Sequence, residues 1–220
     1  LNVPAVKLTY LTGIEKIIDL AEKFGYTTFQ DRSRYGLSIV LGGGEVTLLE
    51  HAAAYGALAR EGVLQKTAMI LRVEDRDGKI LQEWEQEEGE RVLDAETVRI
   101  TNSVLSDNNA RAYAFGEINN LTLGGRPVAA KTGTTNDFRD GWTMGYTPSL
   151  VTGVWVGNNN NSSMTGAASG GTVAAPIWNR YMRAVLGNTP VEQFKSPSDQ
   201  NLPDKPLMNG DGEVTVKVKI

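Results

Sequence analysis

The chain has 220 residues, 40% of them hydrophobic, and its 22 basic and 26 acidic residues give a net charge of −4. These values exclude a disordered chain and allow one or two domains with a buried core. The absence of a basic block argues against a nucleic-acid partner, and no run of about 18 apolar residues occurs that could span a membrane. The absence of cysteine excludes a disulfide, a thiol nucleophile and a cysteine zinc site, and the single histidine has no partner for a metal site, so we expect no cofactor.

Helical spacing and capping residues predict four helices. Thr12 and Glu15 fit a capping box at the start of the first helix, and Gly25 is a suitable stop at its end. Thr47 and Asp94 are suitable N-caps for the next two helices. The predicted helices span residues 13–24, 47–61, 95–106 and 176–186.

Strands are predicted in two regions. An Asp-Gly turn lies between two apolar runs and is typical of a hairpin, and the acidic stretch after it is expected to be an exposed loop. Three further strands are joined by short links and should pair antiparallel. The hairpin strands are 68–74 and 79–84, the acidic loop is 83–90, and the later strands are 127–133, 141–147 and 150–157. Residues 187–212 contain four prolines and are expected to form a poorly ordered linker before an alternating tail strand, 213–220.

The densest chemical signal is the run Lys131-Thr-Gly-Thr-Thr135. A lysine at the end of an apolar strand is costly to bury unless it meets an anion or an active-site hydroxyl. Gly133 allows another molecule to approach the strand edge, and the threonine hydroxyls beside it could hold a carboxylate or an oxyanion. A solvated lysine followed by a Gly-Thr turn would give the same letters, so this run alone does not decide between the two interpretations.

A nucleotide site is an alternative for the same region. Residues 125–132 differ from a Walker A loop by Ala130, which stands where that loop requires glycine. A Walker A loop also connects a strand to a helix, whereas here the would-be loop is itself the strand-like segment. We therefore rank a nucleotide binder third among the functional hypotheses.

The wider context resembles the transpeptidase domain of class A (bifunctional) penicillin-binding proteins. The family's K-T-G-T-T, D-x-W-x-x-G-Y-T-P and V-W-V-G blocks occur in order, together with its segment after S-x-N, its L-G-x-x-E-V-T-x-L-E helix entry and its A-x-P-I-W helix start. These blocks lie at residues 131–135, 140–148, 154–157, 1–7, 41–50 and 174–178. The resemblance covers about residues 1–186, and the ordered blocks make it far more specific than K-T-G alone.

The resemblance implies an α/β (α+β) fold of the β-lactamase/D,D-transpeptidase type, with an antiparallel sheet flanked by helices. Two further strands and a central helix of that fold would come from sequence before Leu1, so we expect a domain truncated on its N-terminal side. Residues 1–186 would form the C-terminal part of the transpeptidase domain, and 187–220 a proline-rich linker and tail.

The resemblance also implies a reaction and its residues. A serine attacks the D-Ala–D-Ala peptide of a peptidoglycan stem and forms an acyl-enzyme, which an amine then resolves; β-lactams acylate the same serine. Lys131 would shape electrostatics and proton transfer, and Asn2 would contact the donor's amide as the last residue of S-x-N. The substrate-binding residues would be Thr132, Gly133, Thr134 and Thr135, with the two even-numbered threonines holding the terminal carboxylate and the N–H of Thr134 serving the oxyanion hole.

The nucleophile is missing from this chain. No Ser-x-x-Lys and no Gly-x-Ser-x-Gly occurs, and the serine of S-x-N would precede Leu1. The literal Ser106-Asp107-Asn108 lies outside the matching context, and we interpret it as the end of the third predicted helix. We therefore expect this chain to be inactive alone. His51, on an alanine-rich helix, is expected to be structural.

The full protein would be anchored at the extracytoplasmic face of a bacterial membrane and carry an upstream glycosyltransferase domain. Its partners would be the D-Ala–D-Ala stem peptide and β-lactam antibiotics, and this chain would either dimerise or associate with the missing N-terminal part. The competing hypothesis is a non-catalytic cell-wall-binding or scaffold module that keeps the cleft without the serine.

Overall fold

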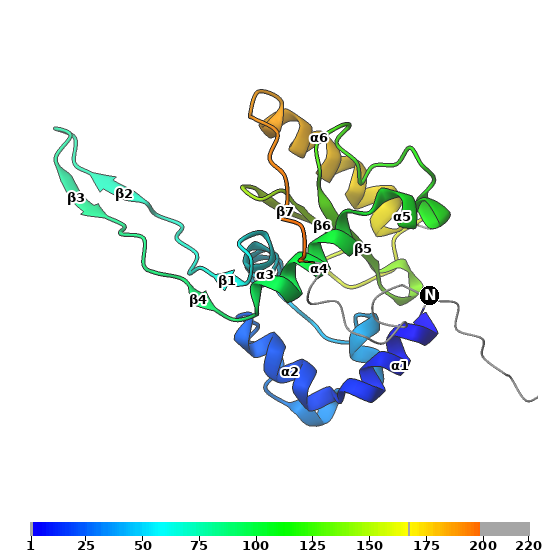
Figure 1. Ribbon diagram of the computed structural model, residues 1–220. Coiled ribbons are helices and arrows are strands. Elements are labelled where there is room, and N and C mark those ends of the chain that lie inside the picture. Colours follow the sequence, from blue (N-terminus) through cyan, green and yellow to red (C-terminus); the bar gives the residue numbers. More distant parts are fainter. Residues whose placement is uncertain (1, 167, 199–220) are drawn as a thin grey trace, which may run out of the picture.

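A computed structural model describes residues 2–166 and 168–198. Helices surround a small antiparallel sheet, and a long hairpin arm projects from this body (Figure 1). This mixed architecture confirms the predicted fold class. None of the helices in the described ranges combines the length and the apolar character needed to cross a bilayer.

The sheet contains three strands in the order β5-β6-β7, all antiparallel, as predicted from the short links. They are β5 (Ala129–Thr134), β6 (Asp140–Tyr146) and β7 (Val151–Gly157). The register places Lys131 opposite Met144 and Gly133 opposite Trp142. Within the described residues β5 is therefore an edge strand.

One face of the sheet packs against α6 (Ala175–Leu186). Its apolar stripe recurs at helical spacing and buries Trp178 and Met182 against Ala130 and Val154. The sequence predicted this helix, with proline in its first turn. It did not predict the single π-helical turn η4 (Gly170–Ala174) that precedes it.

The opposite face packs against α3 (Leu48–Ala59). The ring of His51 lies 5.8 Å from that of Trp142, and Tyr55 lies 5.8 Å from Tyr146. Thr47 caps this helix by accepting a 3.2 Å hydrogen bond from the N–H of Glu50, as predicted.

The next two helices follow each other closely. Asp94 caps α4 (Ala95–Ser106) through the N–H of Thr97, which confirms a predicted N-cap. Asp107 then caps the short α5 (Asn108–Phe115), which the sequence analysis did not identify.

The N-terminal region corrects one prediction. Residues Asn2–Thr12 form a helix, α1, that was not predicted, so Thr12 ends one helix instead of capping the next. Gly13 stands before α2 (Ile14–Lys23) at φ 90°, and no side chain caps that helix. The helix itself and its stop at Gly25, also at φ 90°, are confirmed.

The arm confirms the predicted hairpin with shorter strands. β2 (Arg72–Glu74) pairs with β3 (Ile80–Glu83) around a turn in which Asp75 accepts two backbone hydrogen bonds. At the base of the arm, β1 (Val63–Leu64) pairs with β4 (Glu90–Arg91), so the acidic stretch is not entirely a loop. The remaining short helical turns are η1 (Arg32–Arg34), η2 (Leu37–Leu41) and η3 (Asn136–Phe138).

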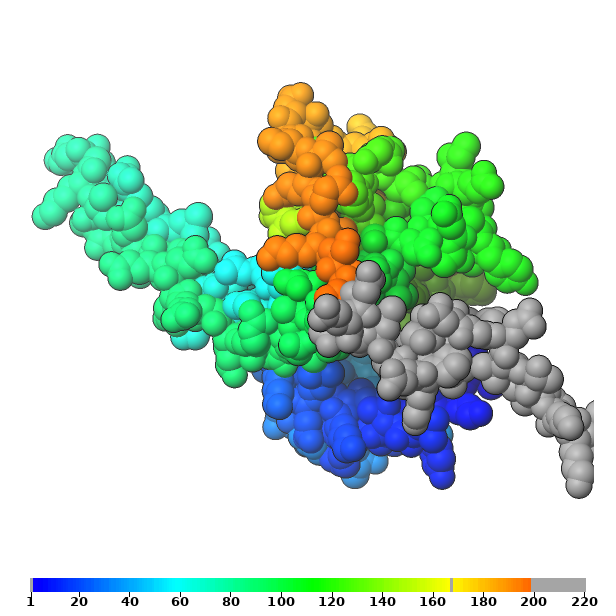
Figure 2. Space-filling view, in the orientation of Figure 1, coloured from blue at the N-terminus to red at the C-terminus, as the bar shows by residue number. Residues whose placement is uncertain are grey.

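Residues 187–198, which we call the strap, contain no helix or strand but make specific contacts along the body (orange in Figure 2). Arg126 donates hydrogen bonds to the carbonyls of Thr189 and Pro190 in the strap and to that of Leu186 just before it. The ring of Phe194 lies 5.7 Å from that of Tyr146. The expectation of a poorly ordered linker is therefore wrong for this segment, because these side chains find partners on the body. The tail strand 213–220 lies outside the described residues, and the domain boundary at 186 stays a prediction.

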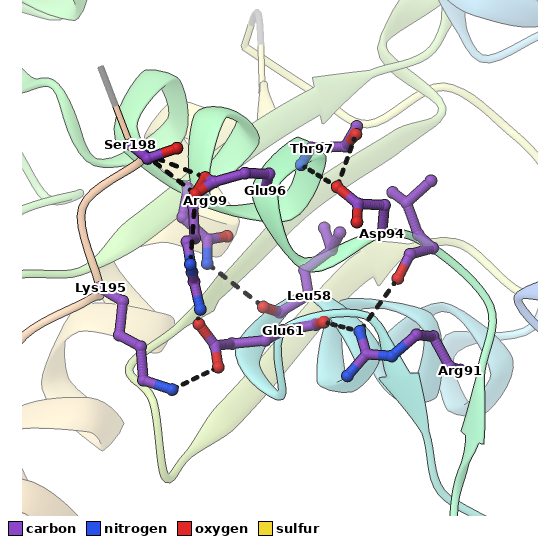
Figure 3. Close-up of polar contacts among 11 residues, drawn as sticks. Leu58, Glu61, Arg91, Asp94, Glu96, Thr97, Arg99, Lys195 and Ser198 are labelled. Atoms are coloured by element: carbon purple, nitrogen blue, oxygen red, sulfur yellow. Dashed lines mark hydrogen bonds and ion pairs between the residues drawn. The ribbon is translucent and has the colours of Figure 1, made fainter. Parts of the chain in front are cut away.

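An ion-pair network joins the strap to two helices (Figure 3). Glu61, two residues after the end of α3, accepts from Arg99 of α4 at 2.7 Å and from Lys195 of the strap at 2.5 Å. The carboxylate of Glu96 accepts from Arg99 and from the backbone N–H of Ser198. The Arg99 and Lys195 hydrogen bonds hold the pKa of Glu61 below its ordinary value.

Candidate active site

Four of the six predicted site residues, Lys131 to Thr134, lie along β5, an open edge of the sheet among the described residues, and Thr135 follows directly after it. Successive side chains alternate between the two faces. Gly133 lies over Trp142 on the α3 face, whereas Thr134 reaches the η4 turn on the α6 face. Thr132 therefore shares a face with Thr134, and Lys131 shares a face with Gly133.

Lys131 stands where the buried part of the strand ends. Ala129 and Ala130 before it are fully enclosed, while the lysine is accessible to solvent. The protein atoms around the ammonium nevertheless desolvate it and lower the pKa of Lys131 below its usual value. Its Nζ donates to the carbonyl of Thr132 at 2.5 Å. A lysine so placed forms the neutral, proton-accepting amine more readily than a free side chain does.

The threonine hydroxyls are used differently. Thr134 Oγ1 accepts a 3.1 Å hydrogen bond from the N–H of Gly170, which leaves its own proton available to donate. Thr135 Oγ1 donates to Asp140 Oδ2 at 2.9 Å and accepts from the N–H of Asp140 at 2.8 Å. The hydroxyl of Thr135 is therefore engaged within the protein, whereas that of Thr134 can also serve a ligand.

Asp140 organises the end of the site, whereas the sequence analysis identified it only as the first residue of the D-x-W block. Its second carboxylate oxygen, Oδ1, accepts from Trp155 Nε1 at 2.8 Å, so it links β7 to the end of β5. The turn between β5 and β6 contains Asp137 and Phe138 at φ 59° and 54°, conformations that non-glycine residues rarely adopt. This turn is thus held in a strained conformation directly beside the threonine run.

The other predicted site residue lies on a different element. Asn2 opens α1 and is exposed, and no hydrogen bond between described residues joins it to β5.

The Ser106-Asp107-Asn108 triplet matches the prediction only in part: Ser106 ends α4, whereas Asp107 and Asn108 form the start of α5. Asp107 caps α5, and Asn108 donates to the Glu117 carbonyl at 3.0 Å and accepts from Asn119 at 2.9 Å.

The geometry also excludes the Walker A alternative. Ala129–Thr134 form a strand that turns through η3 directly into the antiparallel β6. No phosphate-binding loop and no following α-helix are present at this point among the described residues.

His51 is structural, as predicted. Its Nδ1 is 2.6 Å from the hydroxyl of Tyr26, and burial lowers the pKa of the imidazole. Two surface hollows lie elsewhere on the molecule: one is lined by α6 and residues 123–126, the other by residues 106–111 and 121–128, and neither touches the threonine run.

The family model described as penicillin binding protein transpeptidase domain matches residues 1–183. The chain belongs to this family. The match accounts for the order of the K-T-G-T-T, D-x-W and A-x-P-I-W blocks, and it confirms the resemblance drawn from the sequence.

Relatives and solved structures agree with the family match. Penicillin-binding protein 1A of Aquifex aeolicus is 35% identical over 215 residues, which cover 96% of this chain and 28% of the relative. The crystal structure of penicillin-binding protein 1A from Haemophilus influenzae superposes with a TM-score of 0.76 at 23% identity, covering 89% of this chain and 34% of that one. PonA1 from Mycobacterium tuberculosis in complex with penicillin V gives 0.71 at 26% identity, covering 85% and 54%. The chain thus has the transpeptidase fold but spans little more than a quarter of the Aquifex relative.

Proposed function

We propose that this chain is the C-terminal part of a serine D,D-transpeptidase that cross-links peptidoglycan stem peptides through an acyl-enzyme and is acylated by β-lactams. The observation that carries the proposal is the Lys131-Thr-Gly-Thr134 run along the open edge of β5, in a chain of this family. A relative of the same fold has been solved in complex with penicillin V, which supports β-lactams as ligands.

In this proposal each residue of the run has a separate task. The amine of Lys131, with its lowered pKa, takes part in proton transfer at the reacting serine. The hydroxyls of Thr132 and Thr134 bind the carboxylate of the donor peptide or drug, and the N–H of Thr134 donates to the oxyanion. Gly133 leaves room for the ligand to lie along the edge as an added strand. Thr135 supports the end of the run indirectly, through its hydrogen bonds to Asp140.

Asn2 and the nucleophile complete the proposal. The side-chain amide of Asn2 would contact the donor peptide once the rest of the domain surrounds α1. The serine of S-x-x-K would be supplied by the upstream part of the protein, because this chain has no such motif. We therefore propose that the isolated chain has no transpeptidase activity.

We propose that this chain associates with the missing part of its domain and not with a second copy of itself. Helix α1 exposes several large apolar side chains, which a complete domain would be expected to cover: Val3, Leu8, Tyr10 and Leu11. The whole protein would lie at the extracytoplasmic face of the membrane with an upstream glycosyltransferase domain. Light scattering after size exclusion tests the proposed association with the missing part, since a stable dimer of the isolated chain would contradict it.

The function is tested with fluorescent penicillin on the full-length protein and on the isolated chain. We expect covalent labelling of the full-length protein, loss of labelling in Lys131→Ala, and normal labelling in Lys79→Ala, which removes an exposed lysine of the arm. The isolated chain should not be labelled. Equal labelling of the Lys131→Ala variant would overturn the role of this lysine. A full-length protein that binds stem peptide but is never acylated would favour the wall-binding module.

A further inference from the structure

The η4 turn packs closely against the sheet at Gly170, directly behind the threonine run. Gly170 is buried, and a Cβ atom added to it would overlap the carbonyl oxygens of Gly133 and Trp142. These two residues face each other across the β5–β6 ladder, so the obstacle is backbone that cannot move aside. The φ angle of Gly170 is not in the left-handed region, so space alone requires glycine here.

The Gly170 residue is held at both of its polar backbone atoms. Its N–H donates to Thr134 Oγ1 at 3.1 Å, and its carbonyl accepts from Thr143 Oγ1 at 3.1 Å. Thr143 is fully buried and lies opposite Thr132 in the ladder. A capping box between Ser169 and Thr172 fixes the start of the same turn.

This arrangement decides what the Thr134 hydroxyl can do. A hydroxyl has one proton to donate and two lone pairs that accept. Because the N–H of Gly170 occupies one lone pair from the α6 side, the proton is left to donate to a group at the open edge. An anionic acceptor there would receive a charge-assisted hydrogen bond, which is stronger than a neutral one.

We propose that Gly170 is a positioning residue of the transpeptidase site, which holds Thr134 as a hydrogen-bond donor toward the carboxylate of the donor peptide or β-lactam. This inference rests on the function proposed above. Gly170 does not touch the ligand itself; it acts through Thr134, and Thr143 holds it in place.

The test compares Gly170→Ala with Gly171→Ala in the full-length protein. A Cβ at Gly171 would come closest to the ring edge of Phe115 at 3.3 Å, a side chain that can shift, and would make an ordinary contact with Ser169 Oγ at 3.8 Å, so this neighbour is a matched control. The measurement is the second-order rate constant of acylation by benzylpenicillin. We expect a loss of about tenfold to a hundredfold for Gly170→Ala, as for removal of a hydrogen bond to a charged group. Gly171→Ala should stay within about twofold of the parent protein.

A double variant distinguishes a positioning role of Gly170 from a general disturbance of the fold. Thr134→Val removes the hydroxyl through which Gly170 is proposed to act. If the two residues work as a pair, adding Gly170→Ala to Thr134→Val should cost little more than Thr134→Val alone. Additive losses, or equal rates for the two glycine variants, would overturn the inference.

Thr143 provides a milder route if Gly170→Ala does not fold. Thr143→Ser keeps the hydroxyl that binds the Gly170 carbonyl, whereas Thr143→Val keeps the shape and loses the bond. We expect slower acylation only in the valine variant, with both proteins folded by thermal melting. Equal rates for the serine and valine variants would contradict the inference while leaving the proposed function intact. Absence of acylation in the parent protein would instead reject the proposed function and this inference with it.

Discussion

Lys131 illustrates the cost of placing a charged residue at the candidate active site. Desolvation lowers its pKa below 10.5, so the folded state pays to keep the ammonium charged. The folded state therefore binds protons less tightly than the unfolded chain, and stability rises with pH between the folded pKa and the unfolded value. Natural active sites often carry such a penalty.

We therefore predict that Lys131→Met leaves the free energy of unfolding of the isolated chain unchanged or raises it at pH 7. The advantage over the parent chain should shrink as the pH approaches 10.5, where the penalty disappears. Urea denaturation at several pH values provides the measurement, with Lys79→Met as the control for losing one exposed charge. A variant clearly less stable than the parent at pH 7 would contradict this account.

Unlike Lys131, the buried polar pair of Tyr146 and Asn102 is expected to stabilise the fold. Both side chains are almost fully enclosed, and the tyrosine hydroxyl donates to Asn102 Oδ1 at 2.6 Å. Burial raises the pKa of Tyr146, so its hydroxyl remains a neutral hydrogen-bond donor at all ordinary pH values. Asn102 donates in turn to the carbonyl of Leu58, which joins α4 to α3.

Tyr146→Phe should destabilise the chain by about 1–3 kcal/mol, because it leaves a buried amide oxygen without a partner. Urea denaturation of the isolated chain measures the loss. Tyr113→Phe removes the same hydroxyl from a side chain that is 97% exposed and should change nothing. Equal effects of the two substitutions would show that the buried hydrogen bond contributes no net stability.

At the level of single residues, the sequence showed the chemistry but not the contacts. The strand ending at Lys131 and the hydroxyls after it could be found because they are consecutive. The roles of Asp140 and Gly170 could not, since each depends on a segment distant in the chain: Trp155 for the first, and Thr134 for the second. In the sequence, nothing distinguishes Gly170 from its neighbour Gly171, so the close packing of Gly170 against the backbone of β5 and β6 could not be predicted.

Among the elements, predictability followed local signals. The helices opened by Thr47 and Asp94 were found because a cap and an apolar stripe agree. Helix α1 was missed because it buries only Thr9 and therefore shows no stripe, and α5 because it buries no residue at all. The two-residue strands at the base of the arm are too short to show any alternation.

The strap allows apolar packing and ion pairing to be compared within one element. Phe194 is half-buried against the ring of Tyr146, whereas Lys195 is 67% exposed in its pair with Glu61. We predict that Phe194→Ala costs about 1–2 kcal/mol of unfolding free energy, from the lost burial. Lys195→Ala should cost at most about 1 kcal/mol, as exposed ion pairs do.

Chemical denaturation of the two strap variants gives the comparison, and added salt provides a second readout. Salt should reduce the effect of Lys195→Ala and leave that of Phe194→Ala almost unchanged, because only the ion pair is screened. A larger loss for the lysine variant would show that the ion-pair network, not the aromatic contact, fastens the strap.

At the scale of the whole molecule, the arm stands apart from the body that carries the site (Figure 1). Strands β2 and β3 contact chiefly each other, and the arm exposes large apolar side chains, including Met69, Ile70 and Leu81. In the part of the chain that the structure describes, the base of the arm is tied to the core through Leu64 and Val92, which pack with Phe24 and the alanines of α3. Stability should therefore reside at the base of the arm and not along its length.

Replacing residues 66–88 with Asn-Gly tests this division. A two-residue turn of this type suits the pairing of β1 with β4, which would then close directly. We expect the melting temperature of the isolated chain to change by no more than a few degrees, and penicillin labelling of the full-length protein to persist. Val92→Ala, a single buried substitution at the base, should cost more, about 1–3 kcal/mol, because it opens a gap among packed side chains. If removing the arm unfolds the body while Val92→Ala is tolerated, the arm is part of the folding unit. Its lack of contacts with the body would then not reflect its contribution to stability.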